Sequence, residues 1–285
     1  PPPPPPPPPP RRGGCAITPK TVPETQPTGE PTNQPAGATN VPISTLGVTP
    51  QGTYLLRLKV HTGSQGERDV EWSRIEMDAE TVFYEDDEIS RKSIRSLRAK
   101  IKSEIEAVPG GQLLIKNTTT EKEGNHSLRA FGLPELGETI EMKLNSMGHV
   151  TQVTGMPKES VFYLPTVVLP KQAVKVGDTW EETFRWKGEG HPEFLKTSMT
   201  CRWARIEKWR GSRVFRIEVV ARSAFETPVD EMTLESQSKG FFLWDQNRGI
   251  VVYSENSGTD TLISNKNKVM LVTTSEYSSE NITPE

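Results

Sequence analysis

Cysteine and histidine are scarce in this chain, and its apolar runs are short. The 285 residues hold two cysteines and four histidines. No HxH, HExxH or CxxC spacing occurs, so the sequence predicts no metal site. The longest apolar runs, such as those at residues 241–244 and 269–272, are far too short to cross a bilayer. The formal net charge of −3 leaves no basic excess that would favour nucleic acid.

Signatures of catalysis are missing as well. There is no G-x-S-x-G elbow, and no glycine-rich loop stands between a strand and a helix. The acidic residues 85–88 could hold a cation, but they lack the alternation of an EF-hand loop, so we interpret them as a solvated helix lead-in. Glu182 lies among aromatic neighbours, and we expect it to point outward or to lie at an edge. We therefore expect a protein that is not an enzyme and needs no cofactor.

The first 50 residues have a composition that does not fold. Residues 1–10 are all proline, and 17 of the 25 prolines fall within residues 1–50. Such a segment cannot bury enough apolar surface to offset its ordering entropy, which predicts a disordered stalk or linker. A ligand for a proline-reading domain is the alternative. Cys15 follows Arg12-Gly13-Gly14, and it is a candidate lipidation site or else an unmodified thiol.

The remainder reads as two β-rich halves, because apolar residues alternate along short segments bounded by turn signals. We expect an N-terminal β half at 51–156, a connecting segment at 157–177, a C-terminal antiparallel β half at 178–277 and a frayed tail at 278–285. Turns are predicted at 145–148, 209–212 and 245–249. A break in phase near Ala204 suggests a bulge. Cys201 is in step with Met199 and Trp203, which predicts a buried free thiol.

One segment has the spacing of a helix. Ile94, Leu97, Ile101 and Ile105 stand 3, 4 and 4 residues apart, which predicts a helix over 90–107 with these side chains on one face. Ser90 is a suitable N-cap, and Pro109-Gly110 is a stop signal.

Basic residues recur beside that apolar stripe. The candidate ligand or partner face is Arg91, Arg95, Arg98, Lys102, Ile94, Leu97 and Ile101. A basic band beside an apolar face suits anionic lipid or an acidic partner. The alternative is that the stripe packs on the sheet while the basic side chains keep its flank in water.

Residues 169–180, Leu-Pro-Lys-Gln-Ala-Val-Lys-Val-Gly-Asp-Thr-Trp, resemble a motif of exported bacterial β-rich domains of unknown function. In those domains the motif introduces the second of two curved β halves, and the domains look like relatives of lipoprotein-carrier half-barrels. The resemblance implies a mainly β fold with two tandem antiparallel curved sheets, or half-barrels, and one amphipathic helix packed on the first. It implies a bacterial cell-envelope location, periplasmic or surface-exposed, and it supplies no catalytic residues.

Three functions remain open at this level. We expect a non-enzymatic envelope protein on a Pro-rich stalk that binds an envelope partner or assembles with itself, without nucleic acid and without a transmembrane segment. A carrier of lipid or another apolar ligand between sheet and helix is the alternative, and it predicts a cavity lined by Ile94, Leu97 and Ile101. A hydrolase of unrecognised type comes third, and it predicts a cleft where titratable side chains converge.

Overall fold

The computed structural model describes residues 52–59, 68–188, 193–227 and 231–283. The fold belongs to the unit formed by residues 45–285. Residues 1–50, with Cys15 and the predicted stalk, lie outside the described part of the chain. None of the described segments forms a helix long and apolar enough to cross a bilayer.

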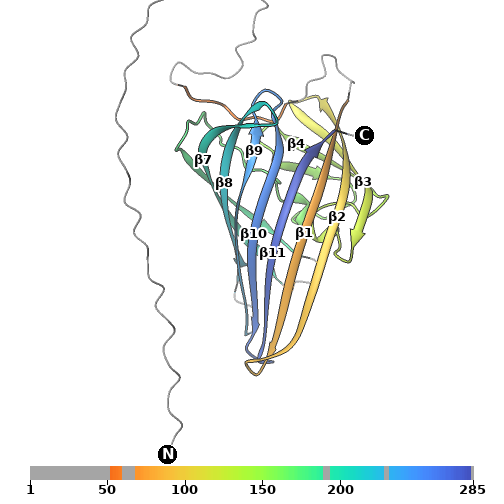
Figure 1. The fold of residues 1–285 in the computed structure, drawn as a ribbon, viewed down its shortest axis with the longest axis vertical. Helices are drawn as coiled ribbons and strands as arrows, with labels where there is room; N and C mark the ends of the chain where they lie inside the picture. The colour runs from red at the N-terminus through yellow and green to blue at the C-terminus, as the bar shows by residue number, and fades with distance from the viewer. Residues whose placement is uncertain (1–51, 60–67, 189–192, 228–230, 284–285) are drawn as a thin grey trace, which may run out of the picture. The chain divides into compact units, whose positions relative to one another are not determined.

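Eleven strands form one antiparallel sheet that does not close (Figure 1). The first five are β1 (Asp69–Glu85), β2 (Glu88–Val108), β3 (Gln112–Gly124), β4 (Thr139–Asn145) and β5 (Val150–Val153). The other six are β6 (Thr179–Trp186), β7 (Leu195–Trp209), β8 (Ser212–Phe225), β9 (Met232–Asp245), β10 (Ile250–Ser264) and β11 (Val269–Ile282). Two short 3-10 turns, η1 (Arg129–Phe131) and η2 (Val161–Tyr163), are the helical elements of the described residues.

The strand order is β5-β4-β3-β2-β1-β11-β10-β9-β8-β7-β6. Neighbours in sequence therefore pair with each other, except β5 and β6, which lie at the two edges. At the centre β1 pairs with β11, from Trp72 opposite Ile282 to Glu85 opposite Val269. Hairpins β1–β2 and β10–β11 turn at the bottom of Figure 1, which we call the lower end of the sheet. The opposite end is the upper end.

Side chains alternate between two faces along each strand. We call the face that carries Leu97, Trp203 and Trp244 the inner face, and the opposite one the outer face. The largest core cluster lies on the inner face of β7, β8 and β9, where Trp203, Trp244, Phe215 and Ile217 are at most 2% exposed. Segment 52–59 and the β5–β6 connection cover it, through buried Leu56 and residues 167–169.

Two hydrogen-bonded contacts hold those covering segments together. Tyr54 exchanges backbone hydrogen bonds with Val174 at 2.7 and 2.9 Å. The Arg57 guanidinium donates to the backbone oxygens of Pro170 and Lys171. Trp180 joins the same core, and its indole Nε1–H donates to the Val168 carbonyl at 2.9 Å, which satisfies a polar group that burial would otherwise penalise.

The predicted helix at 90–107 is wrong, because these residues lie within strand β2. The apolar spacing is ambiguous: a step of four residues keeps Leu97, Ile101 and Ile105 on one face of a helix and also on one face of a strand. Ile94 distinguishes the two structures, because a residue three positions before Leu97 lies on the same face of a helix but on the opposite face of a strand. Ile94 is accordingly 75% exposed, whereas Leu97 and Ile101 are 1% and 2% exposed. The predicted stop at Pro109-Gly110 is the β2–β3 turn.

The prediction of two tandem sheets is also wrong, because the β1–β11 pairing merges both halves into one sheet. That pairing joins residues about 200 positions apart, and no local turn signal announces it. Strand β11 continues to Ile282, through residues 278–282 where fraying is predicted. Segment 52–59 forms an isolated β-bridge at Tyr54 with Val174.

Several local predictions are confirmed. The turns after β4, β7 and β9 fall where the sequence places them. The register of β7 against β8 shifts between Trp203 and Arg205, which is the predicted bulge. Trp203 and Trp244 are fully buried, and Cys201 is a free thiol that is 1% exposed. The outcome is a mainly β protein, as predicted, in a single open sheet.

Candidate functional site

Strand geometry divides the predicted ligand face between both sides of the sheet. Leu97 and Ile101 point to the inner face with Arg91 and Arg95, while Ile94, Arg98 and Lys102 point to the outer face. On the outer face, Arg98 lies 2.9 Å from Asp78 and 3.4 Å from Glu76, and Lys102 lies 2.7 Å from Glu104. The predicted basic band beside an apolar stripe is therefore not one surface.

The inner apolar part of that predicted face is filled. Leu97 and Ile101 form a core cluster with Ile75, Met77 and Ala99 under Leu128, which is 0% exposed. Leu128 comes from the β3–β4 connection, which lies across the inner face of β1 and β2. Where the carrier alternative predicts a cavity, Leu97 and Ile101 are thus covered by the protein itself, whereas Ile94 is exposed on the outer face. The helix that would close such a cavity is strand β2.

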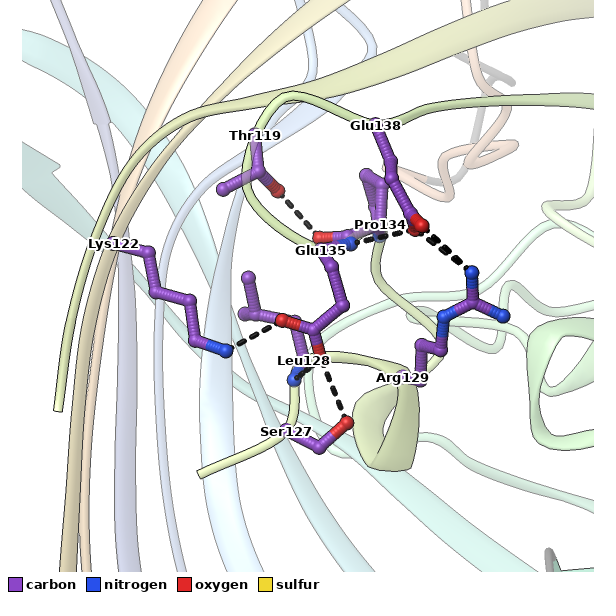
Figure 2. A network of polar contacts seen from close by, with 8 residues as sticks. All are labelled: Thr119, Lys122, Ser127, Leu128, Arg129, Pro134, Glu135 and Glu138. Carbon is purple, nitrogen blue, oxygen red and sulfur yellow. Dashed lines mark hydrogen bonds and ion pairs between the residues drawn. The ribbon is translucent and has the colours of Figure 1, made fainter. Parts of the chain in front are cut away.

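Figure 2 shows how the β3–β4 connection is held in place. Glu135 accepts hydrogen bonds from Lys122 Nζ, from Ser127 Oγ at 2.7 Å and from the Leu128 backbone N–H at 2.8 Å. Partial burial opposes ionisation of Glu135, but these hydrogen bonds prevail and lower its pKa to about 2. The Thr119 hydroxyl donates to the Pro134 carbonyl at 2.6 Å. This network positions Leu128 over the core.

Glu182 lies on the edge strand β6, which is one of the two predicted positions, but its side chain does not point outward. It lies on the inner face of β6, where its Oε2 is 2.8 Å from His149 Nε2. His149 follows the β4–β5 turn, so this contact joins residues next to the two opposite edges of the sheet. Lys171 Nζ stands 3.8 Å from the same carboxylate. The contact ties the upper parts of the two edges together.

Apart from the contact of His149 with Glu182, the sequence-predicted candidates for chemistry lack a suitable setting in the described residues. Burial, followed by the charge of Glu182, raises the pKa of Cys201 to about 12, so its thiol is not a nucleophile in the folded chain. In the described ranges, no three His, Cys, Asp or Glu side chains gather as metal ligands would. His61 and His191 lie outside those ranges. Residues 85–88 are not a helix lead-in: they form the β1–β2 turn, with Asp86 and Asp87 at φ of 48° and 67°.

A hollow of about 600 Å³ lies over the middle of strands β1, β2, β9, β10 and β11. Most of its lining residues carry polar side chains, among them Asp78, Glu80, Glu276 and Lys239, and Ile94 lies beside them. Lys92 and Arg98 pair with Glu80 and Asp78 from its rim. The inner face at this level is lined largely by hydroxyls, such as Thr81 and Thr273, whose side chains are 2.9 Å apart. Neither surface has the apolar lining of a lipid cavity.

The lower end of the sheet is different, because apolar side chains occupy both of its faces. On the inner face these are Phe83, Met232, Leu234, Leu262, Val269 and Leu271, and on the outer face Val82, Tyr84, Ile89, Ile263, Met270 and Val272. We call this set the apolar end. The register lines up Phe83, Leu271, Leu262 and Leu234 as one cross-strand row, and Ile89, Tyr84, Met270 and Ile263 as the row behind it.

The apolar end belongs to none of the four core clusters of the described residues. Its side chains are partly exposed, and Ile89 is 56% exposed. Strands that are apolar on both faces are normally covered on both. With strands about 4.8 Å apart and a rise of about 3.3 Å per residue, four strands of three residues present roughly 200 Å² per face. The two faces point in opposite directions, so each is a separate apolar patch of this size.

Charged turns border the apolar end. The β1–β2 turn carries Glu85, Asp86, Asp87 and Glu88, and the β10–β11 turn carries Lys266 and Lys268. The two turns touch: Lys268 Nζ lies 3.1 Å from Asp86 Oδ1, and the Asp86 N–H donates to the Lys268 carbonyl at 3.1 Å. The apolar run 269–272 is the signal for this site in the sequence. Taken alone, its length shows only that the run is too short to span a membrane.

No protein-family model and no curated protein matches the chain. Among solved structures, it is similar to lipovitellin, in a structure of lipid–protein interactions, with 12% identity and a TM-score of 0.39 over 78% of this chain. The match covers 26% of the lipovitellin chain, so this chain spans about a quarter of that protein. It is also similar to DynF from the dynemicin biosynthesis pathway of Micromonospora chersina, with 9% identity and a TM-score of 0.24 over 80% of this chain and 90% of that one. Both TM-scores are too low to support an inference about function, and no family is assigned.

Proposed function

We propose that this chain is a non-enzymatic protein-binding module that docks through the apolar end of its sheet. The observation that carries the proposal is the loss of alternation at residues 82–84 and 269–272, where neighbouring side chains on opposite faces are all apolar. The apolar rows on both faces are partly exposed. A partner that covers them would gain a binding free energy of roughly 25 cal/mol per Å² of apolar surface removed from water.

A protein partner fits the apolar end better than a membrane does. The acidic residues 85–88 lie beyond the apolar rows at the extreme end of hairpin β1–β2. Inserting that end into a bilayer would carry four carboxylates ahead of the apolar side chains, which is costly. A protein surface can instead place basic side chains against the acidic turn while its apolar centre covers the rows.

Photo-crosslinking in the native cells tests the docking proposal. Benzoylphenylalanine replaces Tyr84 or Met270 in the apolar end, and in the control it replaces Val220, which is on the outer face of β8 and 38% exposed. We expect both apolar-end positions to give one common adduct of discrete protein mass that is missing at position 220. The captured protein is then purified and titrated with the full chain, and Met270→Glu should weaken binding at least about ten-fold. Equal adducts at all three positions, or none, would contradict the proposal.

We also propose a bacterial cell-envelope location, with the Pro-rich segment as a stalk. The support is the resemblance of residues 169–180 to exported bacterial domains and the composition of residues 1–50. Lipidation at Cys15 is part of this proposal. Metabolic labelling with radioactive palmitate should mark the full chain and fail to mark Cys15→Ser, and equal labelling of both proteins would exclude Cys15 as the anchor.

A further inference from the structure

We propose that the inner face of the apolar end binds a second copy of this chain, with the lower ends of the two sheets overlapping across a two-fold axis that runs along the row Phe83–Leu271–Leu262–Leu234. This inference rests on the proposed docking function and names the occupant of one of its two faces. The outer face, with Tyr84 and Met270, is left for another partner.

The first support is the shape of the row itself. Phe83, Leu271, Leu262 and Leu234 are consecutive cross-strand neighbours on four adjacent strands. A two-fold axis along this row places each of these residues against its own equivalent, and the resulting interface is isologous. Stacked sheets lie about 10 Å apart, a spacing that Phe and Leu side chains from two facing sheets fill.

The second support is the pattern of charge on either side of the row. Toward the middle of the sheet, the inner face carries Arg95 on β2 and Asp260 on β10, and both are exposed. On the other side of the row, hairpin β1–β2 ends in the acidic turn and hairpin β10–β11 ends in the basic turn. Each strand pair therefore has opposite charges above and below the apolar row.

The proposed two-fold axis converts this pattern into complementarity. Rotation about the row exchanges the two sides while keeping each strand opposite its own equivalent. The acidic turn of one copy thus comes to lie over Arg95 of the other, and the basic turn of one copy over Asp260 of the other. The interface would have an apolar centre and a rim of paired charges, as protein interfaces commonly do.

The outer face of the same strands lacks this pattern. On the inner face, Arg91 is the cross-strand neighbour of Phe83 and ends the row on β2, with its guanidinium carbon 4.2 Å from the centre of the Phe83 ring. On the outer face of the same strand pair, Lys92 is engaged by Glu80 at 3.2 Å. The inner face therefore combines an apolar row with charges that complement those of a second copy of the chain.

Sedimentation of the full chain, in reductant so that no disulfide at Cys15 contributes, tests the inference. We expect a concentration-dependent species of twice the chain mass of 31.8 kDa. Leu271→Glu, on the inner face, should raise the dimer dissociation constant at least about ten-fold. Met270→Glu, its neighbour on the outer face, should leave that constant within about two-fold and serves as the matched control.

A charge exchange tests the orientation. Asp260→Lys should weaken the dimer because it sets like charges against the basic turn, and adding Lys266→Glu should restore it. The two-fold arrangement would be overturned if Met270→Glu weakened the dimer as strongly as Leu271→Glu. It would also be overturned if Lys266→Glu did not restore the dimer of Asp260→Lys. A chain that is monomeric up to about 100 μM overturns self-association, while an apolar-end adduct with a different protein would still uphold the docking function.

Lipid binding is the remaining outcome. If the monomeric chain floats with vesicles of phosphatidylcholine and phosphatidylglycerol, and Leu271→Glu stops that flotation, the inner face contacts a membrane and the inference is overturned.

Discussion

Replacing Leu97 and Ile94 separately by alanine distinguishes a strand from a helix at residues 88–108. Leu97 is 1% exposed within the cluster under Leu128. Its truncation removes buried methyl groups and leaves a cavity that the hydrogen-bonded β3–β4 connection cannot easily fill, so we expect a loss of about 2–5 kcal/mol. Ile94 is 75% exposed, and its replacement should cost less than about 1 kcal/mol, mostly through strand propensity.

Urea denaturation followed by tryptophan fluorescence measures both effects. With an m-value of about 2–3 kcal/mol/M, Leu97→Ala should lower the urea midpoint by roughly 1 M or more, whereas Ile94→Ala should shift it by less than about 0.5 M. Ile101→Ala is the positive control, because Ile101 is 2% exposed in the same cluster. Equal losses at positions 94 and 97 would refute the strand geometry, since only a helix places those two side chains on one buried face.

Three further predictions follow from single contacts. Because the pKa of Glu135 is lowered from 4.5 to about 2, its stabilising contribution is complete above pH 4.5 and is lost as the pH falls toward 2. The native chain should therefore lose stability more steeply than Glu135→Gln over that range in acid titrations followed by fluorescence, and parallel curves would exclude the network. Cys201, buried and with a pKa raised to about 12, should react with iodoacetamide at pH 8 only after unfolding, and labelling of the native chain would contradict its burial. His149→Ala should cost about 1–3 kcal/mol in urea denaturation and speed hydrogen exchange in the β4–β5 hairpin, because it removes the contact with Glu182; unchanged exchange there would show that the contact does not hold the edge.

Local features of the second half could be predicted from the sequence because short-range physics determines them. The turn at 245–249, the bulge next to Ala204 and the burial of Trp203 depend on neighbours within a few residues or on strict alternation. Residues 90–107 could not be assigned, because a four-residue apolar step satisfies both periodicities and the decisive residue, Ile94, was grouped with the wrong face.

The long-range contacts could not be predicted from the sequence, for a different reason. The β1–β11 pairing and the contact between His149 and Glu182 bring together residues that no local pattern relates. The inward position of Glu182 depends on His149 arriving from the opposite edge. The apolar end was visible in sequence as residues 82–84 and 269–272, but its meaning required the register that places those runs side by side at one end of the sheet.

Thiol labelling on the two faces of the apolar end tests the central claim most directly. Phe83→Cys, on the inner face, and Tyr84→Cys, on the outer face, are made in the full chain with Cys15→Ser, so that buried Cys201 is the only other thiol. In dilute solution both thiols should react with a maleimide at rates within about ten-fold of an exposed Val220→Cys control. If either face reacts only after denaturation, that face is covered by the chain itself, and a sheet with apolar side chains open to partners on both faces would be contradicted.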